Sequence, residues 1–214
     1  MSDSATQLGP VPQRLRNPAD RFRLGKGNCG PVTLGDYWQW SGSSLLDNTE
    51  RGIVAEFLVA LALGLTESPR LEWASFDLET AAGTKIEVKS AAYLQSWHQE
   101  RYSTISFRIA PTTWEWDPES QKSHRHDPPK HLADAYVFCL LKHKCKATVN
   151  PLDTEQWQFY VMPTSRINDR KPDTKSIGVR ALSKLAGGAV AFSEIADAVA
   201  IIEKDLRKSG CHSP

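Results

Sequence analysis

A long run of apolar residues lies between positions 52 and 63 of the chain, and Glu56 is its only charged member. The residues before it, Asp47-Asn48-Thr49-Glu50, offer a helix cap with a carboxylate three positions further on. Gly64, directly after the run, is a natural stop signal for a helix. The pattern therefore predicts a helix between Asp47 and Gly64 that is buried on most of its sides.

The pattern changes to a period of two residues between Leu71 and Ala92. A short segment of small residues, 81–84, divides this stretch into two halves, which is typical of a β-hairpin. Neighbouring side chains in such a hairpin leave on opposite faces, so that one face is apolar. The apolar positions are Trp73, Phe76, Leu78, Ile86 and Val88.

Three further segments are rich in β-branched or aromatic residues and are predicted to be strands, at about 104–109, 135–141 and 158–162. Near the end of the chain, Ser193 can cap a helix over residues 194–207, where apolar residues recur at helical spacing. Together these elements predict an α/β fold with a mixed central β-sheet flanked by helices.

Two stretches lack a sustained apolar period. Residues 1–30 are rich in Pro, Gly, Ser, Asn and charge and are interpreted as a flexible N-terminal arm. Residues 31–214 are then a single domain, because 214 residues suffice for one well-buried core. The stretch 111–131 carries prolines, charges and three histidines, and is interpreted as a long surface loop.

The charges of the chain nearly cancel, since 26 Lys and Arg stand against 25 Asp and Glu, a net charge of +1. Binding to nucleic acid would therefore need a local basic patch. Four cysteines without a CxxC pair favour reduced thiols over a disulfide scaffold. The sequence shows neither an apolar signal-peptide core nor an apolar run of about 18 residues. We expect a soluble, cytoplasmic protein that has no membrane as a partner.

The predicted hairpin gathers charged side chains on its polar face. Glu87 and Lys89 are two residues apart, so they leave their strand on the same side. Folding the hairpin about Ala82 places Asp77 opposite Glu87, because both are equally distant from that centre. Two facing carboxylates repel, so a positive charge is expected between them. A magnesium ion, which prefers hard oxygen ligands, would supply this positive charge. Lys89 by itself would also neutralise part of the negative charge.

The lone carboxylate of the apolar helix is a second anomaly. Burying Glu56 is costly unless its charge is paired or bound to a metal. None of the helical neighbours three and four positions away can neutralise it. Its partner is therefore expected from elsewhere, and the polar face of the hairpin is the obvious candidate. Those neighbours are Gly52, Ile53, Val59 and Ala60.

The order of these features resembles the core of the PD-(D/E)xK, or restriction-endonuclease-like, nucleases. The resemblance covers roughly residues 47–110 and includes a helix with Glu56, a strand with Asp77, a turn, and a strand with Ile86-Glu87-Val88-Lys89-Ser90. Phe76 stands where the motif name has proline, a loose position. Residues 93–99 do not fit the Gln-xxx-Tyr signature of the exonuclease branch, although Gln95 and Gln99 would share one side of a helix.

The resemblance implies roles for particular residues. Asp77 and Glu87 would bind the metal, and Lys89 would position or activate the attacking water. Glu56 would be an additional ligand, and the peptide carbonyl of Val88 a further one. The implied cofactor is Mg²⁺, for which Mn²⁺ is expected to substitute.

These roles imply a divalent-metal-dependent nuclease, with a DNA endonuclease as the favoured function. Homodimers are implied by the resemblance alone. The alternative is a catalytically idle domain of the same fold that binds nucleic acid or protein. A third class is an interaction subunit whose hairpin carries an ordinary solvated salt bridge between Lys89 and Asp77 or Glu87.

Histidines and tryptophans remain outside this scheme. The histidines of residues 111–131, with His143 and Cys145, suggest a zinc site, but their spacing favours solvated side chains. His126 or His131 would then be an auxiliary group near a phosphate.

Four of the seven tryptophans form W-x-W pairs, at 38 and 40 and at 114 and 116. Each pair shares one face if the backbone is extended, where the rings stack on bases or, more commonly, pack in a core or dimer interface.

Overall fold

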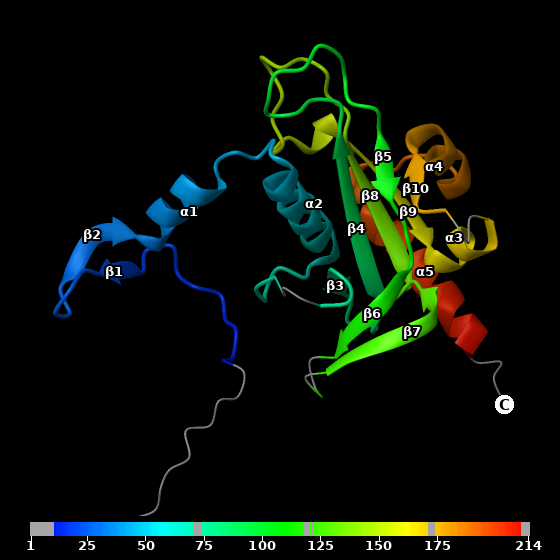
Figure 1. Ribbon diagram of the computed structural model, residues 1–214, viewed down its shortest axis with the longest axis horizontal. Coiled ribbons are helices and arrows are strands. Elements are labelled where there is room, and N and C mark those ends of the chain that lie inside the picture. Colours follow the sequence, from blue (N-terminus) through cyan, green and yellow to red (C-terminus); the bar gives the residue numbers. More distant parts are fainter. Residues whose placement is uncertain (1–10, 71–73, 118–119, 121, 171–173, 211–214) are drawn as a thin grey trace, which may run out of the picture.

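A four-stranded sheet of mixed orientation forms the centre of the computed structural model, which describes residues 11–70, 74–117, 120, 122–170 and 174–210 (Figure 1). Its strand order is β3-β4-β8-β9. The middle pair, β4 and β8, is parallel, and both outer pairs are antiparallel. The strands are β3 (Leu78–Glu79), β4 (Lys85–Ala92), β8 (Ala135–Leu141) and β9 (Trp157–Pro163).

Strand β8 is buried along its whole length because both faces of the sheet are covered. Its alternate residues enter two separate clusters of buried side chains. Ala135, Val137 and Cys139 belong to one cluster, whereas Tyr136 and Phe138 belong to the other. This explains why residues 135–141 form a continuous apolar run, and it confirms the strand predicted there.

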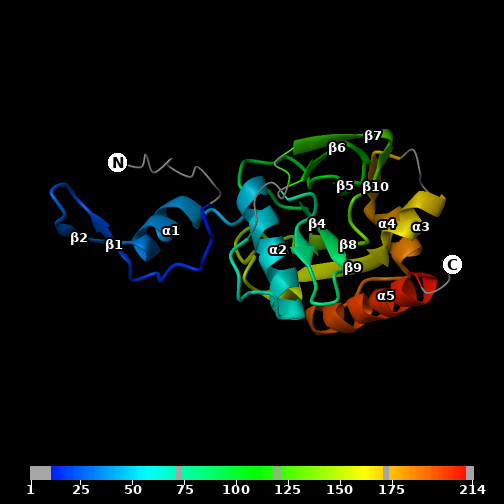
Figure 2. The same ribbon diagram turned by 90° about the horizontal axis from the view of Figure 1, so that it is seen from below.

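Helices and short strands cover the two faces of the sheet (Figures 1 and 2). The first cluster lies under α2 (Asn48–Leu63) and α5 (Ile195–Gly210). The second cluster lies under a mixed layer of a two-stranded sheet and two helices. The prediction of an α/β fold with a mixed sheet flanked by helices is confirmed. The mixed layer consists of β5 (Ser106–Arg108), β10 (Ser176–Gly178), α3 (Thr164–Arg170) and α4 (Val179–Ala186).

Helix α2 begins and ends where the sequence predicts, with Asp47 at the N-cap and Gly64 at the C-cap in the left-handed conformation. The prediction that it is buried on most sides is wrong. Ile53, Phe57 and Leu61, spaced four apart, form an exposed stripe. Only one flank of α2 faces the sheet, and apolar content alone does not reveal which flank is covered.

Helix α5 begins at Ile195, after the 3-10 turn η2 (Phe192–Glu194), so the predicted cap at Ser193 is wrong. In its place, a carboxylate oxygen of Glu194 accepts a hydrogen bond from the backbone N–H of Ala191. At 16 residues, α2 and α5 are the longest helices of the described chain. Neither they nor any shorter helix in the described ranges is long and apolar enough to cross a membrane.

The described residues on both sides of 118–121 form two paired strands and not the predicted loop. Strands β6 (Thr112–Asp117) and β7 (Lys122–Lys130) pair antiparallel with each other and with no strand of the central sheet. Most residues of both strands are exposed or half-exposed, so no apolar alternation marks them in the sequence. In both views the hairpin lies across one end of the mixed layer (Figures 1 and 2).

The N-terminal segment carries regular structure within the range predicted to be a flexible arm. Strands β1 (Arg21–Arg23) and β2 (Cys29–Thr33) pair antiparallel, and α1 (Leu34–Gly42) follows directly. The predicted boundary at residue 30 therefore falls inside β2. This unit projects away from the main body in both views (Figures 1 and 2), and α1 contains no buried residue. Without core contacts, these elements leave no apolar period in the sequence.

Two leucines of α2 test the assignment of its buried flank. Leu58 is 6% exposed and packs in the first cluster, whereas Leu61 is 48% exposed. Leu58→Ala should lower the free energy of unfolding by about 2–5 kcal/mol, because it leaves a cavity. Leu61→Ala should change it by about 0.5 kcal/mol or less. Urea unfolding of both variants measures the difference, and equal losses would contradict the assignment.

Candidate functional site

Backbone pairing between β3 and β4 places Asp77 beside Glu87. Leu78 is the register partner of Ile86, and the N–H of Asp77 donates to the Ile86 carbonyl oxygen at 3.0 Å. The Val88 N–H in turn donates to Oδ2 of Asp77 at 2.7 Å. The hairpin is thus centred on Ala82, as the sequence predicts, and its apolar and polar residues separate onto opposite faces.

Glu87 and Lys89 lie together on the polar side of β4. Lys89 Nζ forms an ion pair with Oε1 of Glu87, and both side chains are partly buried. Tyr136 of the neighbouring strand β8 is the register partner of Glu87 and therefore shares its face. Burial raises the pKa of the Tyr136 hydroxyl, and the negative charges of Glu87 and Asp77 raise it further. Acidic charge therefore accumulates at this end of the sheet.

Among the carboxyl groups of the site, that of Asp77 has its pKa shifted furthest from the ordinary value. Its pKa is raised to about 7, chiefly by burial and then by the charge of Glu87. The charge of Glu56 raises the pKa further, whereas the hydrogen bond from Val88 and the charge of Lys89 lower it. The opposing effects do not balance, so negative charge at Asp77 remains under-compensated.

Glu56 reaches the same region from α2. Its carboxylate pairs with Arg70 through two hydrogen bonds, one of them from Arg70 Nη2 to Oε1 at 3.3 Å. The counter-charge is therefore an arginine from the segment after α2, and the prediction that the hairpin supplies it is wrong. Glu56 is nevertheless close enough to Asp77 to raise its pKa. Arg70 lies between the helical run and the alternating stretch and belongs to neither pattern, which explains why the sequence did not reveal this partner.

Two pockets flank the acidic residues. Glu87, Tyr136 and His131 line one pocket of about 390 Å³, into which the β6–β7 hairpin also projects. Asp77 and Glu56 line the other, of about 830 Å³, which runs along the exposed stripe of α2. Ala74 borders both pockets, so they adjoin. An extended ligand lying in the two pockets would pass over the acidic residues.

The donor chemistry of the site fits a hard divalent cation in part. Asp77 and Glu87 offer carboxylate oxygens, and magnesium is commonly held by one or two carboxylates together with substrate phosphate. Among the described residues, however, no group of three or more His, Cys, Asp or Glu side chains converges closely enough to hold a metal ion. Glu56 is paired with Arg70, and Val88 contacts Asp77 through its N–H.

The histidines considered for zinc are engaged elsewhere. His126 Nε2 lies 2.8 Å from Glu115 Oε2, and His143 Nε2 lies 2.8 Å from Thr148 Oγ1. His131 is held by the Ile109 carbonyl and by Asn168, and it lines the Glu87 pocket. The three cysteines within the described ranges, Cys29, Cys139 and Cys145, are free thiols, and Cys211 lies outside those ranges.

A buried arginine, which the sequence did not single out, supports the far end of β4. Arg51 of α2 donates to the side chains of Ser90, Gln95 and Asn48 and to the Leu46 carbonyl. Burial lowers its pKa. Gln95 belongs to this network in the loop after β4, so the helix considered for Gln95 and Gln99 is absent from these described positions. The network fixes α2 against β4 one residue beyond Lys89.

No protein-family model, no curated protein and no solved structure matches this chain. The assignment of the site therefore depends on the contacts, charges and pockets described above.

The raised pKa of Asp77 predicts how stability depends on pH. Protonated Asp77 is favoured in the folded state, so its contribution is fully present below about pH 4 and is lost as pH rises through about 7. One such group changes the free energy of unfolding by at most about 1.4 kcal/mol per pH unit. Asp77→Asn should flatten this slope. Urea unfolding between pH 5 and 8 in chelator measures it, with Asp169→Asn on an exposed part of α3 as the control.

Proposed function

We propose that the chain is a divalent-metal-dependent nuclease with a restriction-endonuclease-like core, and that its substrate is DNA. The observation that carries the proposal is the pair of carboxylates Asp77 and Glu87, which line two adjoining pockets. Asp77 is under-compensated, and Glu87 has Lys89 beside it on β4. Perturbed acids in a cleft, next to a lysine, are typical of sites that handle phosphate and water.

The residues of the chain have separate tasks in this scheme. Lys89, at Nζ, donates a hydrogen bond to the attacking water or to a phosphate oxygen and offsets charge that develops at phosphorus. The backbone pairing of β3 and β4 holds Asp77 and Glu87 in fixed register. Arg51 is a positioning residue, because it fixes α2 against Ser90, the residue after Lys89.

Mg²⁺ or Mn²⁺, when bound by Asp77 and Glu87, would lower the pKa of a coordinated water and neutralise charge on the phosphate. Glu56 and the carbonyl of Val88 complete the set of groups proposed to face that ion or its waters. Arg70, which pairs with Glu56, brings positive charge to the side of the cleft from which α2 approaches. We further propose a cytoplasmic location and action as a homodimer, in which two sites cut two strands.

Cleavage of plasmid DNA tests the proposal directly. Purified protein should nick or linearise supercoiled plasmid with magnesium and should not do so with chelator. Lys89→Ala should slow cleavage by about 100-fold or more, the usual contribution of a group that moves or stabilises a proton. Asp77→Asn and Glu87→Gln should abolish it, because each removes a proposed metal ligand.

Matched variants at exposed positions control for charge and expression. These are Asp169→Asn in α3, Glu155→Gln in the turn before β9, and Lys204→Ala in α5, and each should cleave at the rate of the unmodified protein. Cleavage that survives chelation, or that is unchanged in Lys89→Ala, would contradict the assignment.

A second candidate function is the idle domain, which binds nucleic acid or protein without cutting. The observation that favours it is that Glu87 already pairs with Lys89 and Glu56 with Arg70, so two of the three carboxylates have an internal counter-charge. Such a domain needs no metal. The two functions therefore differ in whether a divalent cation stabilises the fold.

Thermal unfolding separates the two functions without an activity assay. If the site binds magnesium, the ion should raise the midpoint temperature, by about 2–4 °C for each kcal/mol of binding free energy. The rise should be larger at pH 8 than at pH 6, because protons compete for Asp77. Asp77→Asn should remove the rise, whereas Asp169→Asn should keep it. The idle domain predicts equal midpoints with magnesium and with chelator at both pH values.

A further inference from the structure

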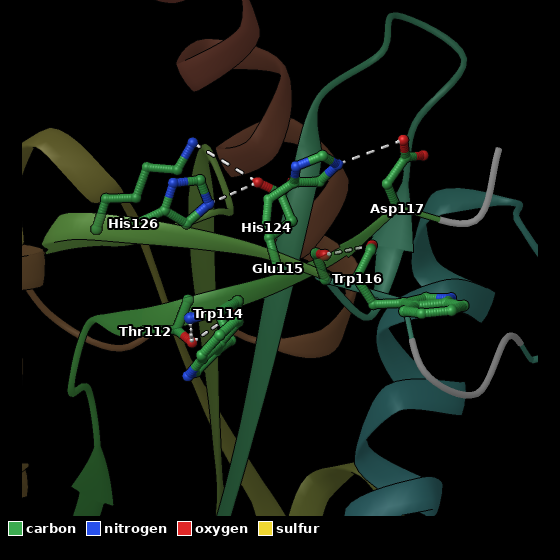
Figure 3. A network of polar contacts seen from close by, with 9 residues as sticks. Thr112, Trp114, Glu115, Trp116, Asp117, His124 and His126 are labelled. Atoms are coloured by element: carbon green, nitrogen blue, oxygen red, sulfur yellow. Dashed lines mark hydrogen bonds and ion pairs between the residues drawn. The ribbon is translucent and has the colours of Figure 1, made fainter. Parts of the chain in front are cut away.

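Two exposed tryptophans of β6 border the pocket that contains Glu87. Trp114 is 58% exposed and Trp116 is 39% exposed, which excludes core packing for either ring. The strand is extended, so both leave the same face of the hairpin, while Glu115 and His126 leave the other (Figure 3). Both tryptophans line the pocket together with Glu87. In contrast, Trp38 and Trp40 lie in the helix α1, so the extended geometry considered for them is absent.

The hairpin holds Trp114 and Trp116 by backbone contacts. The Trp114 N–H donates to Oγ1 of Thr112 at 3.2 Å, and that hydroxyl donates to the Trp114 carbonyl oxygen at 2.9 Å. Ser75, in the segment before β3, donates to the Trp116 carbonyl oxygen at 3.3 Å. The two rings are therefore presented from a fixed backbone that is tied to the segment leading to Asp77.

Charges on the hairpin are distributed in a way that suits a polyanion. Arg125 is the register partner of Trp114 and shares its face, and Lys130 lines the pocket together with Glu115, whose Oε2 lies 3.7 Å from Lys130 Nζ. The acidic residues have cationic or titratable neighbours of their own: Glu115 contacts His126 and Lys130, and Asp117 lies 3.8 Å from His124 (Figure 3). The side of the hairpin that carries the tryptophans thus offers the aromatic rings together with the positive charge of Arg125, and Lys130 offsets the charge of Glu115 at the pocket.

The dimensions of the pocket favour a single unpaired base over a base pair. At about 390 Å³ it is near the small end of the range for small-molecule pockets. A base in a duplex is already stacked on its neighbours, so it cannot also cover a tryptophan ring unless it leaves the stack. A base in a single strand has a free face.

We propose that Trp114 and Trp116 form a stacking platform for unpaired nucleotides, with Arg125 and Lys130 contacting the flanking phosphates. The platform would hold a single strand so that the next phosphodiester lies at Glu87 and Lys89. This inference rests on the proposed nuclease function for its substrate class. It adds that the chain prefers single-stranded or unpaired nucleic acid over a fully paired duplex.

Binding measured in chelator tests the platform independently of cleavage. Fluorescence anisotropy of labelled oligothymidylate of 20 nucleotides, compared with a blunt duplex of the same length, gives the affinities. The unmodified protein should bind the single strand at least about 10-fold more tightly. Trp114→Leu and Trp116→Leu should each weaken that binding by about 10-fold or more, because each removes a stacking ring.

Three variants separate stacking from other causes. Trp97→Leu, in the loop after β4 and 53% exposed, should bind like the unmodified protein. Trp114→Phe and Trp116→Phe should retain most of the affinity, because phenylalanine keeps a π-face. The platform is refuted if the leucine and phenylalanine variants of Trp114 and Trp116 bind the single strand with the same affinity as each other. It is also refuted if Trp97→Leu loses as much affinity as Trp114→Leu and Trp116→Leu.

The salt dependence of binding distinguishes ring contacts from phosphate contacts. The Arg125→Ala and Lys130→Ala variants should each reduce the slope of log affinity against log salt concentration by about 1, whereas the leucine variants should leave it unchanged. Oligouridylate as a second ligand separates RNA from DNA as the preferred strand. Tight single-strand binding without any magnesium-dependent cleavage would refute the nuclease and retain the platform, whereas cleavage of duplex DNA without a single-strand preference would refute only the platform.

Discussion

The pairing of β3 with β4 forces two carboxylates together, and much of the site depends on that constraint. Slipping the register by one residue would relieve the repulsion between Asp77 and Glu87, but it would also turn Leu78 and Ile86 out of the core. Burial of the hydrophobic face therefore fixes the register, and the polar face must accommodate the repulsion between the two carboxylates. The remaining ways to reduce the repulsion are protonation of Asp77, the ion pair with Lys89, and an added cation.

Strand β8 supplies the rigidity that makes this constraint effective. Its side chains pack in both clusters of buried residues. Strand β4, which pairs with β8, therefore cannot shift without disrupting the packing of both clusters. The buried Arg51 ties the other end of β4 to α2. The β6–β7 hairpin has no such support from the central sheet, since it pairs only with itself. The molecule thus combines a fixed acidic site with an exposed aromatic hairpin beside it.

Sequence periodicity predicted the parts of the structure in which burial repeats along an element. Helix α2 and the register of Asp77 against Glu87 were recognisable because one face of each element repeats in the core, and strand β8 was recognisable because both of its faces are buried. The β6–β7 hairpin escaped detection because both of its faces are largely exposed, and Arg70 because it acts through a single ion pair. Contacts of this kind depend on tertiary placement, which local pattern does not encode.

The three acidic residues differ in how their charges are compensated, and this ranks them as ligands in the proposed function. Glu56 faces a doubly hydrogen-bonded arginine and Glu87 a lysine, whereas the contact of Asp77 within the described ranges is a neutral N–H donor. A cation therefore gains most at Asp77, whose pKa is raised for the same reason. Glu87 would become the second ligand of the cation once Lys89 turns away from it toward a phosphate. Glu56 would have to give up Arg70 first, so it is placed to hold a water of the ion in preference to the ion itself.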